Sequence, residues 1–405
     1  MSGSAPSRKA PAARVRIVAS SDHHACAKRR NDVWRRARSI LAVRLDGIGD
    51  LLMTTPALRA LKVSTANRSL TLLTSPTAAA LARELPFVDD VIAFAAPWTK
   101  SAGASPVAAD ATLALVERLR THAFDAAVIF TVCTQSALPA ALLLHLCGIP
   151  RRAAYCRENP YDLLTDWRPE PDRDVRIGVR HEVQRQIDLV ESLGIRVSDR
   201  RLQFPVSDDA RARMIAKVVN AGMDPARAWL VVHPGATAPS RRYPPDKLGD
   251  AIAALASDGR FQIAVAGGRE DLASAEALAA RARDAIVLAG KLDLPELAAL
   301  IDVAEIVVCN NSAPAHIAAA VGTPVVDLYA LTNPQHTPWR VSHRLLFRNV
   351  ECKGCLKSVC PQVHHRCLAG VEPHEIVAAV DELVADAPMR RVSRSRCATA
   401  RMVTQ

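Results

Sequence analysis

The turn Asp46-Gly47-Ile48-Gly49-Asp50 places two carboxylates around two glycines, directly after an apolar run. Glycine lets a backbone approach a ligand closely, and a carboxylate beside such a turn is a candidate for catalysis. Asp50 also stands where a helix is expected to begin, and aspartate is a common helix cap. The full dinucleotide fingerprint is absent because no third glycine follows at the required spacing. Capping and catalysis are both open for Asp50, and the two roles are compatible.

A second polar loop, residues 233–237, follows another apolar run and precedes Arg241 and Arg242. Its small residues, a hydroxyl and two guanidinium groups predict a site for a diphosphate anion. The alternative is an exposed loop whose arginines lie in solvent. A third turn, Gly267-Gly268, is better explained by tight packing of a helix on its strand. The candidate ligand-binding residues of the second loop are Gly235, Ala236, Thr237 and Arg241.

The strongest signal is Cys309-Asn310-Asn311-Ser312-Ala313-Pro314, where an apolar strand ends in small polar residues. Proline is tolerated in the first turn of a helix, so we expect a helix to start near Pro314. Free amides of that turn favour a phosphate group. His316 lies in the same turn and would bond a ligand oxygen or the preceding loop. The candidate residues of this block are Asn311, Ser312, Ala313 and His316.

A cysteine-rich segment spans residues 352–367. Its cysteines and histidines are Cys352, Cys355, Cys360, His364, His365 and Cys367. Their spacing is not that of a paired Cys-x2-Cys zinc ribbon. A structural zinc ion, free buried thiols and a redox or disulfide role all stay open. We expect none of them to take part in the reaction.

Short apolar runs, typical of buried parallel strands, alternate with helical stretches along most of the chain. The expected strands are 40–45, 70–73, 91–94, 126–130, 229–232, 262–266, 285–288, 306–308 and 324–328. The expected helices are 51–62, 77–85, 108–122, 137–147, 181–193, 246–256, 270–283, 294–303, 313–321 and 373–385. Residues 157–180 break this rhythm and predict a long surface loop. The alternation indicates an α/β protein with two doubly wound parallel sheets.

The formal net charge of +11 is concentrated at the two ends of the chain. Residues 1–39 carry a net charge of +8 and residues 387–405 of +5, which leaves −2 between them. This distribution predicts two disordered basic ends around a nearly neutral folded part. It argues against a nucleic-acid-binding protein. Attraction to an anionic membrane leaflet or acceptor, and solvated ends without a role, both stay open.

The sequence also bears on location. The first 39 residues lack the apolar centre of a secretory signal, and the most apolar stretch, residues 137–149, is too short to span a bilayer. Ten cysteines in such a chain indicate a reducing compartment. We therefore expect a cytoplasmic protein, with peripheral contact to the inner face of the membrane as a further expectation.

Three blocks of the sequence, taken in order, resemble glycosyltransferase family 9, the ADP-heptose:lipopolysaccharide heptosyltransferases and their relatives. The blocks are residues 44–58, 233–236 and 311–320, within a match from about 40 to 385. The resemblance implies a GT-B fold, in which two Rossmann-like domains face a central cleft and the second holds most of the donor. It also implies inversion at the anomeric carbon without a metal, and it gives Asp50 the role of general base.

The resemblance implies an organisation and a pair of substrates. An acceptor-side domain at 40–200 is followed by a nucleotide-sugar-binding domain at 201–386, and the charge distribution adds a basic extension at 1–39 and a basic tail at 387–405. The implied donor is a nucleotide-diphosphate sugar such as ADP-heptose, and the implied acceptor is an anionic glycolipid or glycan of the lipopolysaccharide type. Gly49 and Arg241 are expected near the donor. Arg241 stands where the family has a lysine near the phosphates, and Arg242 is one residue away.

Two residues depart from the family pattern, in which the third block reads Asp, then Thr or Ser, then Gly. Asn311 lacks the charge that would grip sugar hydroxyls, and Ala313 has less backbone freedom than glycine. These departures bear on the identity of the donor sugar more than on the fold, so the donor sugar stays open. The altered block leaves open a nucleotide-sugar-binding protein without transfer activity. A nucleotide-sugar epimerase on the same fold is a second alternative.

Overall fold

The computed structural model describes residues 32–100, 109–171, 178–282 and 284–386. The predicted basic tail at 387–405, and residues 1–31 of the predicted basic extension, lie outside these ranges. Within the described part, the chain forms two parallel six-stranded sheets with helices on both faces. This arrangement confirms the α/β class and the two Rossmann-like sheets expected from the sequence.

The first sheet has the strand order β3-β2-β1-β4-β5-β6, with every neighbouring pair parallel. Its strands are β1 (Ser39–Arg44), β2 (Ser69–Thr74), β3 (Asp90–Ala93), β4 (Ala126–Ile129), β5 (Arg152–Cys156) and β6 (Asp166–Pro169). Its helices are α2 (Ile48–Val63), α3 (Ala79–Glu84), α4 (Ala109–Thr121), α5 (Leu138–Leu146) and α6 (Glu182–Glu191). The order reverses between β1 and β4, at the kind of switch point where open α/β sheets bind ligands.

The second sheet repeats this topology with the order β12-β11-β10-β7-β8-β9. Its strands are β7 (Trp229–His233), β8 (Gln262–Val265), β9 (Ile286–Val287), β10 (Ile306–Asn310), β11 (Val325–Leu328) and β12 (His343–Leu346). Its helices are α7 (Asp208–Asn220), α8 (Pro245–Ser257), α9 (Leu272–Ala279), α10 (Leu294–Val303), α11 (Ala313–Val321), α12 (Arg366–Ala369) and α13 (Pro373–Asp386). Here the switch point lies between β7 and β10.

The first sheet with its helices forms the first half of the molecule, and the second sheet with its helices forms the second half. One hydrophobic core runs through both halves. It contains Leu58 of α2, Ile187 of α6, Ile301 of α10 and Ile317 of α11, together with side chains from the facing sides of both sheets. Two further clusters lie under α4 and α5 on the far side of the first sheet, and under α8, α9 and α13 on the far side of the second. The strands are therefore covered on both faces, which explains their continuous apolar runs.

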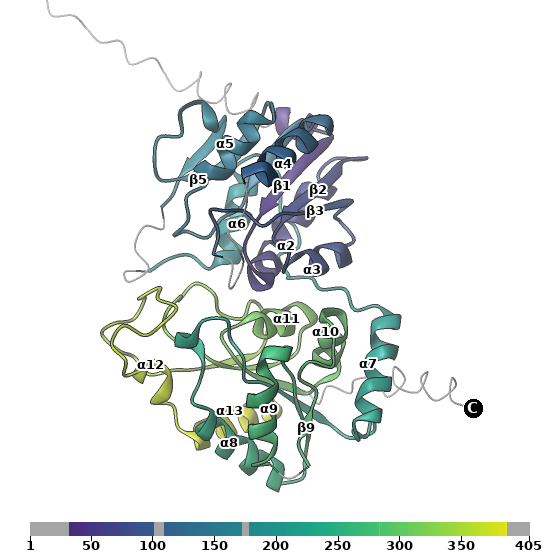
Figure 1. Cartoon of the computed structure of the whole chain (residues 1–405), viewed down its shortest axis with the longest axis vertical. Helices are drawn as coiled ribbons and strands as arrows, with labels where there is room; N and C mark the ends of the chain where they lie inside the picture. The colour runs from purple at the N-terminus through teal and green to yellow at the C-terminus, as the bar shows by residue number, and fades with distance from the viewer. Residues whose placement is uncertain (1–31, 101–108, 172–177, 283, 387–405) are drawn as a thin grey trace, which may run out of the picture.

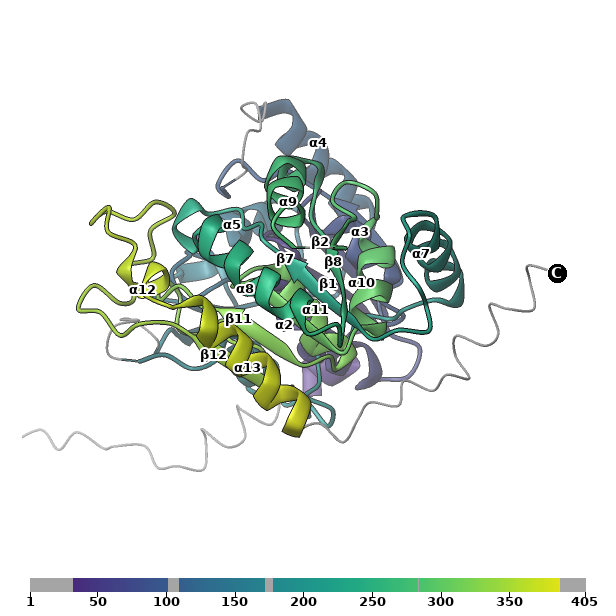
Figure 2. The same ribbon diagram turned by 90° about the horizontal axis from the view of Figure 1, so that it is seen from below.

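The inner helices of the two halves lie against one another. Figure 1 shows the first half, in purple and blue, above the second half, in green and yellow. At their junction α2 packs against α11, and α3 against α10. Figure 2, seen from below, shows α13 in yellow on the outer side of the second half. The loops that follow β1 and β10 are thereby brought to the junction between the halves.

Some elements were missed or misjudged from the sequence. The expected surface loop at 157–180 contains β6, which pairs with β5 at the edge of the sheet. Pro169 ends this strand, and an edge strand tolerates proline because it needs fewer ladder bonds. β5 begins with Arg152 and is followed by only four apolar residues, and Arg344 stands inside the four-residue strand β12, so the pattern did not predict those strands.

The folded part of the chain includes residues that the charge distribution assigned to the basic extension. Residues 32–36, assigned from the sequence to a disordered extension, form a helical turn in which Trp34 is fully buried. The buried guanidinium of Arg68 donates to the carbonyls of Trp34 and Ala37, at 2.6 and 2.9 Å. A large aromatic side chain adds much buried apolar area, which offsets the cost of ordering this basic stretch.

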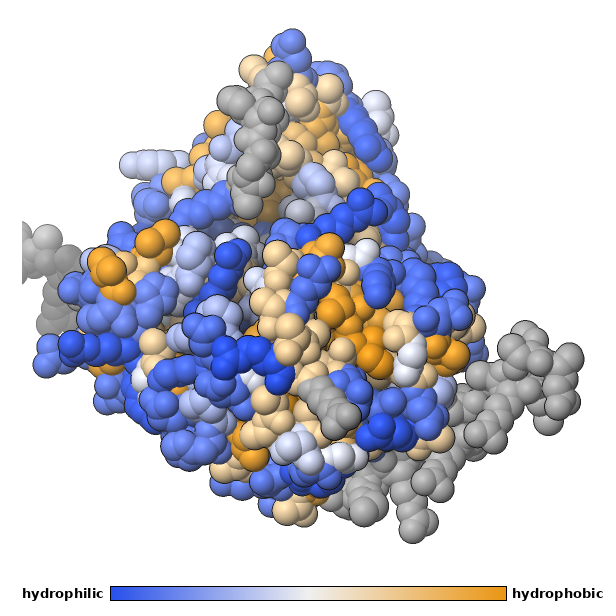
Figure 3. Space-filling view, turned by 60° about the horizontal axis from the view of Figure 1, so that its bottom comes forward, coloured by the Kyte–Doolittle hydropathy of each residue, from blue (hydrophilic) through white to orange (hydrophobic). Residues whose placement is uncertain are grey.

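No helix in the described ranges is long and apolar enough to cross a bilayer. Figure 3 shows the underside of the second half, where hydrophilic residues cover most of the surface and hydrophobic residues form separate patches.

Candidate active site

Asp50 lies in the first turn of α2, at the carboxyl end of β1. Its Oδ2 accepts the backbone N–H of Gly47 at 3.3 Å, and this bond satisfies one of the free amides at the start of the helix. The carboxylate nevertheless keeps 25% of its side-chain surface exposed, so a substrate has access to it. The structure confirms the capping role and leaves the carboxylate available for chemistry.

Arg44, the last residue of β1, contacts three carboxylates at once. Its Nε lies 3.0 Å from Asp46 Oδ2, its Nη2 3.2 Å from Asp50 Oδ1, and its Nη1 3.1 Å from Glu182 Oε1. Arg44 and Glu182 are fully buried, and Gln186 also donates to Glu182 Oε1 at 2.6 Å. A planar guanidinium holds several carboxylates in one geometry, which a lysine does not. Arg44 therefore fixes the direction in which the carboxylate of Asp50 points.

The two aspartates that share Arg44 have pKa values shifted in opposite directions. Burial alone would raise the pKa of Asp50, but the charge of Arg44 and neighbouring groups of the second half outweigh burial and lower that pKa. Burial raises the pKa of Asp46 to about 6, although Arg44 acts against it. Asp50 is therefore ionised throughout the neutral range, as a proton acceptor must be.

Asn310 ties together the two loops at the switch point of the second sheet. Its buried side chain accepts the N–H of Tyr243 at 2.9 Å and donates to the carbonyl of Pro234. Ser312, the residue before α11, donates to the carbonyl of Gly235 at 3.3 Å. The loop after β7 and the start of α11 therefore form one rigid unit, with the amides of the first helical turn at its edge.

Arg241 and Arg242 have different surroundings. Arg241 ends the short 3-10 helix η2 (Pro239–Arg241), and its Nη1 donates to the carbonyl of Asn311 at 3.4 Å. Its charge also acts on Asp50 across the junction. Arg242 is exposed, and its Nε donates to the carbonyl of Ala236 at 2.8 Å. The geometry thus favours Arg241, rather than Arg242, as the cation at the junction.

His316 of α11 reaches the turn of the first half that carries Asp50. A Cβ placed on Gly49 would lie 2.8 Å from Cδ2 of His316. Burial lowers the pKa of His316 to about 3, and it lowers the pKa of His336 as well, so both rings are neutral near pH 7. Asp50, His316 and Arg241 therefore meet where the two halves face one another.

Several buried polar atoms near this junction have no partner within the described residues. They are Nδ1 of His316, Oε1 of Gln335 and Nε2 of His336 in the second half, and Oε2 of Glu182 and Oε1 of Gln186 in the first half. Buried polar groups are normally hydrogen-bonded, so a group of unpaired atoms at this junction indicates a place for a polar ligand.

The remaining predicted residues have distinct positions. Thr237 is exposed, whereas Ala236 and Gly235 are buried. A Cβ on Gly235 would lie 2.3 Å from Oδ1 of Asp271, so packing within the protein already requires glycine there. Asp271 also accepts the N–H of Gly268 at 3.0 Å, which agrees with tight packing at that turn.

Three residues of the junction were missed from the sequence: Arg44, Glu182 and His336. Arg44 belongs to the first block of the family resemblance. It was not recognised as a site residue because it ends an apolar run, as an ordinary residue at the end of a strand would. Glu182 comes 138 residues later and only the fold brings it to Arg44. His336 stands in a stretch without periodicity.

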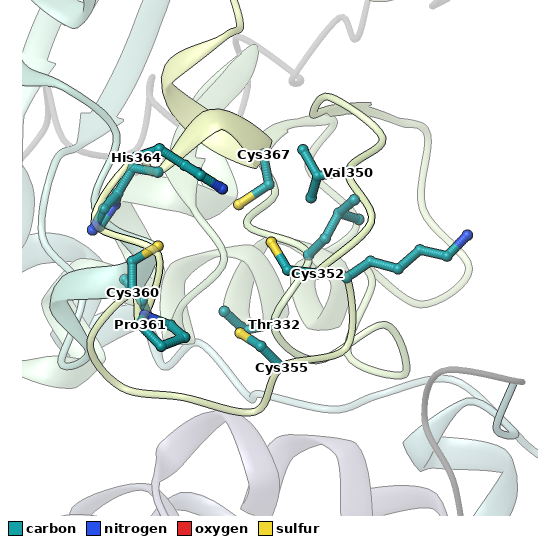
Figure 4. A pocket seen from close by; sticks show the side chains of 12 residues that line it. Thr332, Val350, Cys352, Cys355, Cys360, Pro361, His364 and Cys367 are labelled. Atoms are coloured by element: carbon teal, nitrogen blue, oxygen red, sulfur yellow. The ribbon is translucent and has the colours of Figure 1, made fainter.

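The four cysteines of the segment 352–367 surround one small hollow, as Figure 4 shows. They are partly exposed free thiols, and the described residues contain no group of three His, Cys, Asp or Glu side chains placed to hold a metal ion. The segment supports the loop that carries Arg241. Ser240 donates from its hydroxyl to the carbonyl of Lys357 at 2.6 Å and from its amide to Ser358 at 2.9 Å.

Comparison with known proteins identifies the family. The model of glycosyltransferase family 9 (heptosyltransferase) matches residues 112–365. Lipopolysaccharide heptosyltransferase 3 of Escherichia coli K12 is 27% identical over 296 residues, which cover 72% of this chain and 82% of that protein. Lipopolysaccharide heptosyltransferase 2 of Salmonella typhimurium is 24% identical over 362 residues, which cover 86% and 99%. The chain belongs to glycosyltransferase family 9, and it is a glycosyltransferase.

Solved structures agree on the fold. A glycosyl transferase of family 9 from Veillonella parvula superposes with a TM-score of 0.72 at 18% identity, covering 86% of this chain and 98% of that one. The ADP-heptose lipopolysaccharide heptosyltransferase II of E. coli gives 0.67 at 20% identity, with coverage of 86% and 98%. The expected GT-B fold is confirmed, and the alternatives of a binding protein and of an epimerase are not favoured.

Proposed function

We propose that this glycosyltransferase moves a heptose-type sugar from an ADP-linked donor to an acceptor of the lipopolysaccharide type. The transfer inverts the anomeric carbon, and Asp50 is the general base. The names of the two relatives support the sugar and the acceptor class. The observation that carries the proposal is the meeting of Asp50, from the first sheet, with Arg241 and His316 from the second.

The proposed chemistry needs one proton acceptor on the acceptor side. The carboxylate of Asp50 takes the proton of an acceptor hydroxyl as that oxygen attacks the anomeric carbon of the donor sugar. The bond between that carbon and the diphosphate breaks on the opposite face, and its electron pair leaves with the diphosphate oxygen. Arg44 keeps Asp50 ionised and pointed at the junction throughout.

The donor side must stabilise the charge that develops on the diphosphate. Arg241 supplies a cation, and the first amides of α11 supply hydrogen-bond donors at the positive end of a helix. A donor site built from these groups carries the leaving charge without a metal ion, and we propose that none is required.

We further infer that the chain divides functionally near residue 200. Residues 40–200 would hold the acceptor, and residues 201–386 would hold the nucleotide sugar. This division is supported by the two switch points, one in each sheet. The cytoplasmic location, the peripheral membrane contact and the role of the basic ends stay predictions.

Two measurements on the purified protein test the donor and the reaction class. Thermal unfolding is followed with ADP, UDP, GDP and ADP-heptose, because a ligand that binds the folded state raises the melting temperature. We expect ADP and ADP-heptose to give the largest shifts. Products are then analysed with acceptor, and with acceptor plus EDTA; transfer should persist in both. Isomerised nucleotide sugar formed without acceptor would support an epimerase instead.

A further inference from the structure

A cavity of about 170 Å³ lies at the switch point of the first sheet. It is bounded by residues at the carboxyl ends of β1 and β4 and by the loop after β3. Its lining includes apolar Leu45, Trp98 and Phe130 and polar Asp46 and Gln135. Since one water needs roughly 10–15 Å³ of such space, the cavity has room for a ring-sized molecule. The proposed donor site, at the other switch point, does not use it.

The polar side of the cavity is fixed in place. Oε1 of Gln135 accepts the N–H of Val132 at 3.3 Å, so the amide group of Gln135 must donate in the other direction, to Asp46 Oδ1 at 2.6 Å. The other oxygen of Asp46 contacts Arg44. A carboxylate has about four acceptor positions and a primary amide has two N–H groups. Asp46 and Gln135 therefore keep both acceptor and donor capacity for a ligand.

The apolar side of the cavity contains an aromatic ring. The ring of Trp98 is half-buried and lies 6.0 Å from the ring of Phe94, centroid to centroid, which restrains its position. A site with one apolar wall and a few placed polar groups is the usual form of a small-molecule site. A sugar ring has matching parts, because its C–H faces are apolar and its hydroxyl groups lie around the rim.

The charges at this cavity select against an anion. Asp46 lines it and Asp50 shares the same guanidinium. No Lys or Arg is among the described residues that line the cavity, and Arg44 behind Asp46 is fully buried and contacts three carboxylates. Arg185 and Arg157 are occupied at the edge of the cavity, where they donate to the carbonyls of Thr131 and Cys133. A phosphate group in the cavity would lie against the carboxylate of Asp46 with no cationic side chain in the lining, whereas a neutral polyol would find hydrogen-bond partners.

We propose that this cavity binds a neutral sugar ring of the acceptor, with its apolar face on Trp98 and its hydroxyl groups on Asp46 and Gln135. The inference rests on the proposed function, and it specifies where the acceptor lies. Because Arg44 holds Asp46 and Asp50 on one guanidinium, a ring seated in the cavity has its next hydroxyl within reach of the general base. Anionic groups of the acceptor then lie outside the cavity.

Binding of an oligosaccharide to the full-length protein tests this proposal. The probe is a lipid-free, heptose-terminated oligosaccharide prepared from truncated lipopolysaccharide, and calorimetry measures its affinity and that of ADP. The variants are Trp98→Ala and Gln135→Leu, with Trp98→Phe as a milder change that keeps an aromatic wall. Leu146→Ala is the matched control, because Leu146 belongs to the same half and is 52% exposed on α5.

We expect Trp98→Ala and Gln135→Leu each to weaken oligosaccharide binding about tenfold, while ADP binding stays unchanged. Trp98→Phe should weaken it less, and Leu146→Ala should not weaken it. Oligosaccharide affinity that is unchanged in all variants would overturn the proposal, as would no binding to the wild type, or an equal loss of ADP affinity. A protein that binds the oligosaccharide through these residues without transferring sugar would contradict the proposed function but not the cavity assignment.

Discussion

The imidazole of His316 lies directly against Gly49, although the two residues belong to different halves of the protein. Any side chain on Gly49 would start with a Cβ only 2.8 Å from Cδ2 of His316. This contact brings the first turn of α11 against the first turn of α2, and with it the donor side of the junction against Asp50. Glycine at position 49 is therefore required by the approach of the two halves.

A first prediction concerns this contact. Gly49→Ala adds one methyl group that must push the ring of His316 or separate the two turns, and misplacement by about 1 Å can cost roughly a hundredfold in rate. We expect kcat/KM to fall at least tenfold, with a loss of stability of about 1–3 kcal/mol. Gly47→Ala is the comparison, because its nearest neighbour is 3.9 Å away, at Asp50 Oδ2. Equal losses in both variants would contradict the contact.

A second prediction concerns Arg44 and the pH dependence of the reaction. Arg44 lowers the pKa of Asp50, so its removal should raise that pKa and keep the base protonated over more of the acidic range. The double variant Arg44→Gln/Glu182→Gln removes one charge of each sign, which avoids leaving Glu182 buried and unpaired.

The acid limb of the kcat/KM profile should therefore move to higher pH in the double variant. Arg44→Lys retains a cation but loses the fork that contacts three carboxylates, and it should show a smaller shift. A uniformly lower rate with an unmoved acid limb would show that Arg44 acts through structure alone.

A third prediction concerns stability. Arg68 is buried and donates to the carbonyls of Trp34, Ala37 and Leu61. Arg68→Ala leaves these buried acceptors unpaired and releases the N-terminal turn, so we expect a loss of about 3 kcal/mol in the free energy of unfolding. Arg201→Ala, at a side chain 78% exposed, should leave the free energy of unfolding nearly unchanged. Urea unfolding measures both, and similar losses would refute the assignment.

Much of the fold and part of the site follow from the sequence, for different reasons. Strands buried on both faces are continuous apolar runs in the sequence. Polar residues that follow such runs, such as Asp50 and Asn311, can therefore be recognised from the sequence. β5 and β12 were not recognised because both are short and contain an arginine, Arg152 at the start of β5 and Arg344 within β12. Glu182 was not found because only the tertiary fold brings it to Arg44.

The sequence also did not predict the surroundings of individual side chains. Asp50 caps α2, contacts Arg44 and stays partly exposed, and no local pattern distinguishes that combination from capping alone. Gly235 illustrates the opposite case, since its small size is required by Asp271 of the same half whether or not a ligand binds.

The most direct test of the account is the rate of sugar transfer by Asp50→Asn. Asparagine keeps the shape of the side chain but does not accept the proton, so we predict a fall in kcat of about a hundredfold to ten-thousandfold. The ADP-induced rise in melting temperature should stay as in the wild type, which would show that the donor side is intact. Near-normal turnover in Asp50→Asn would contradict the assignment of the general base.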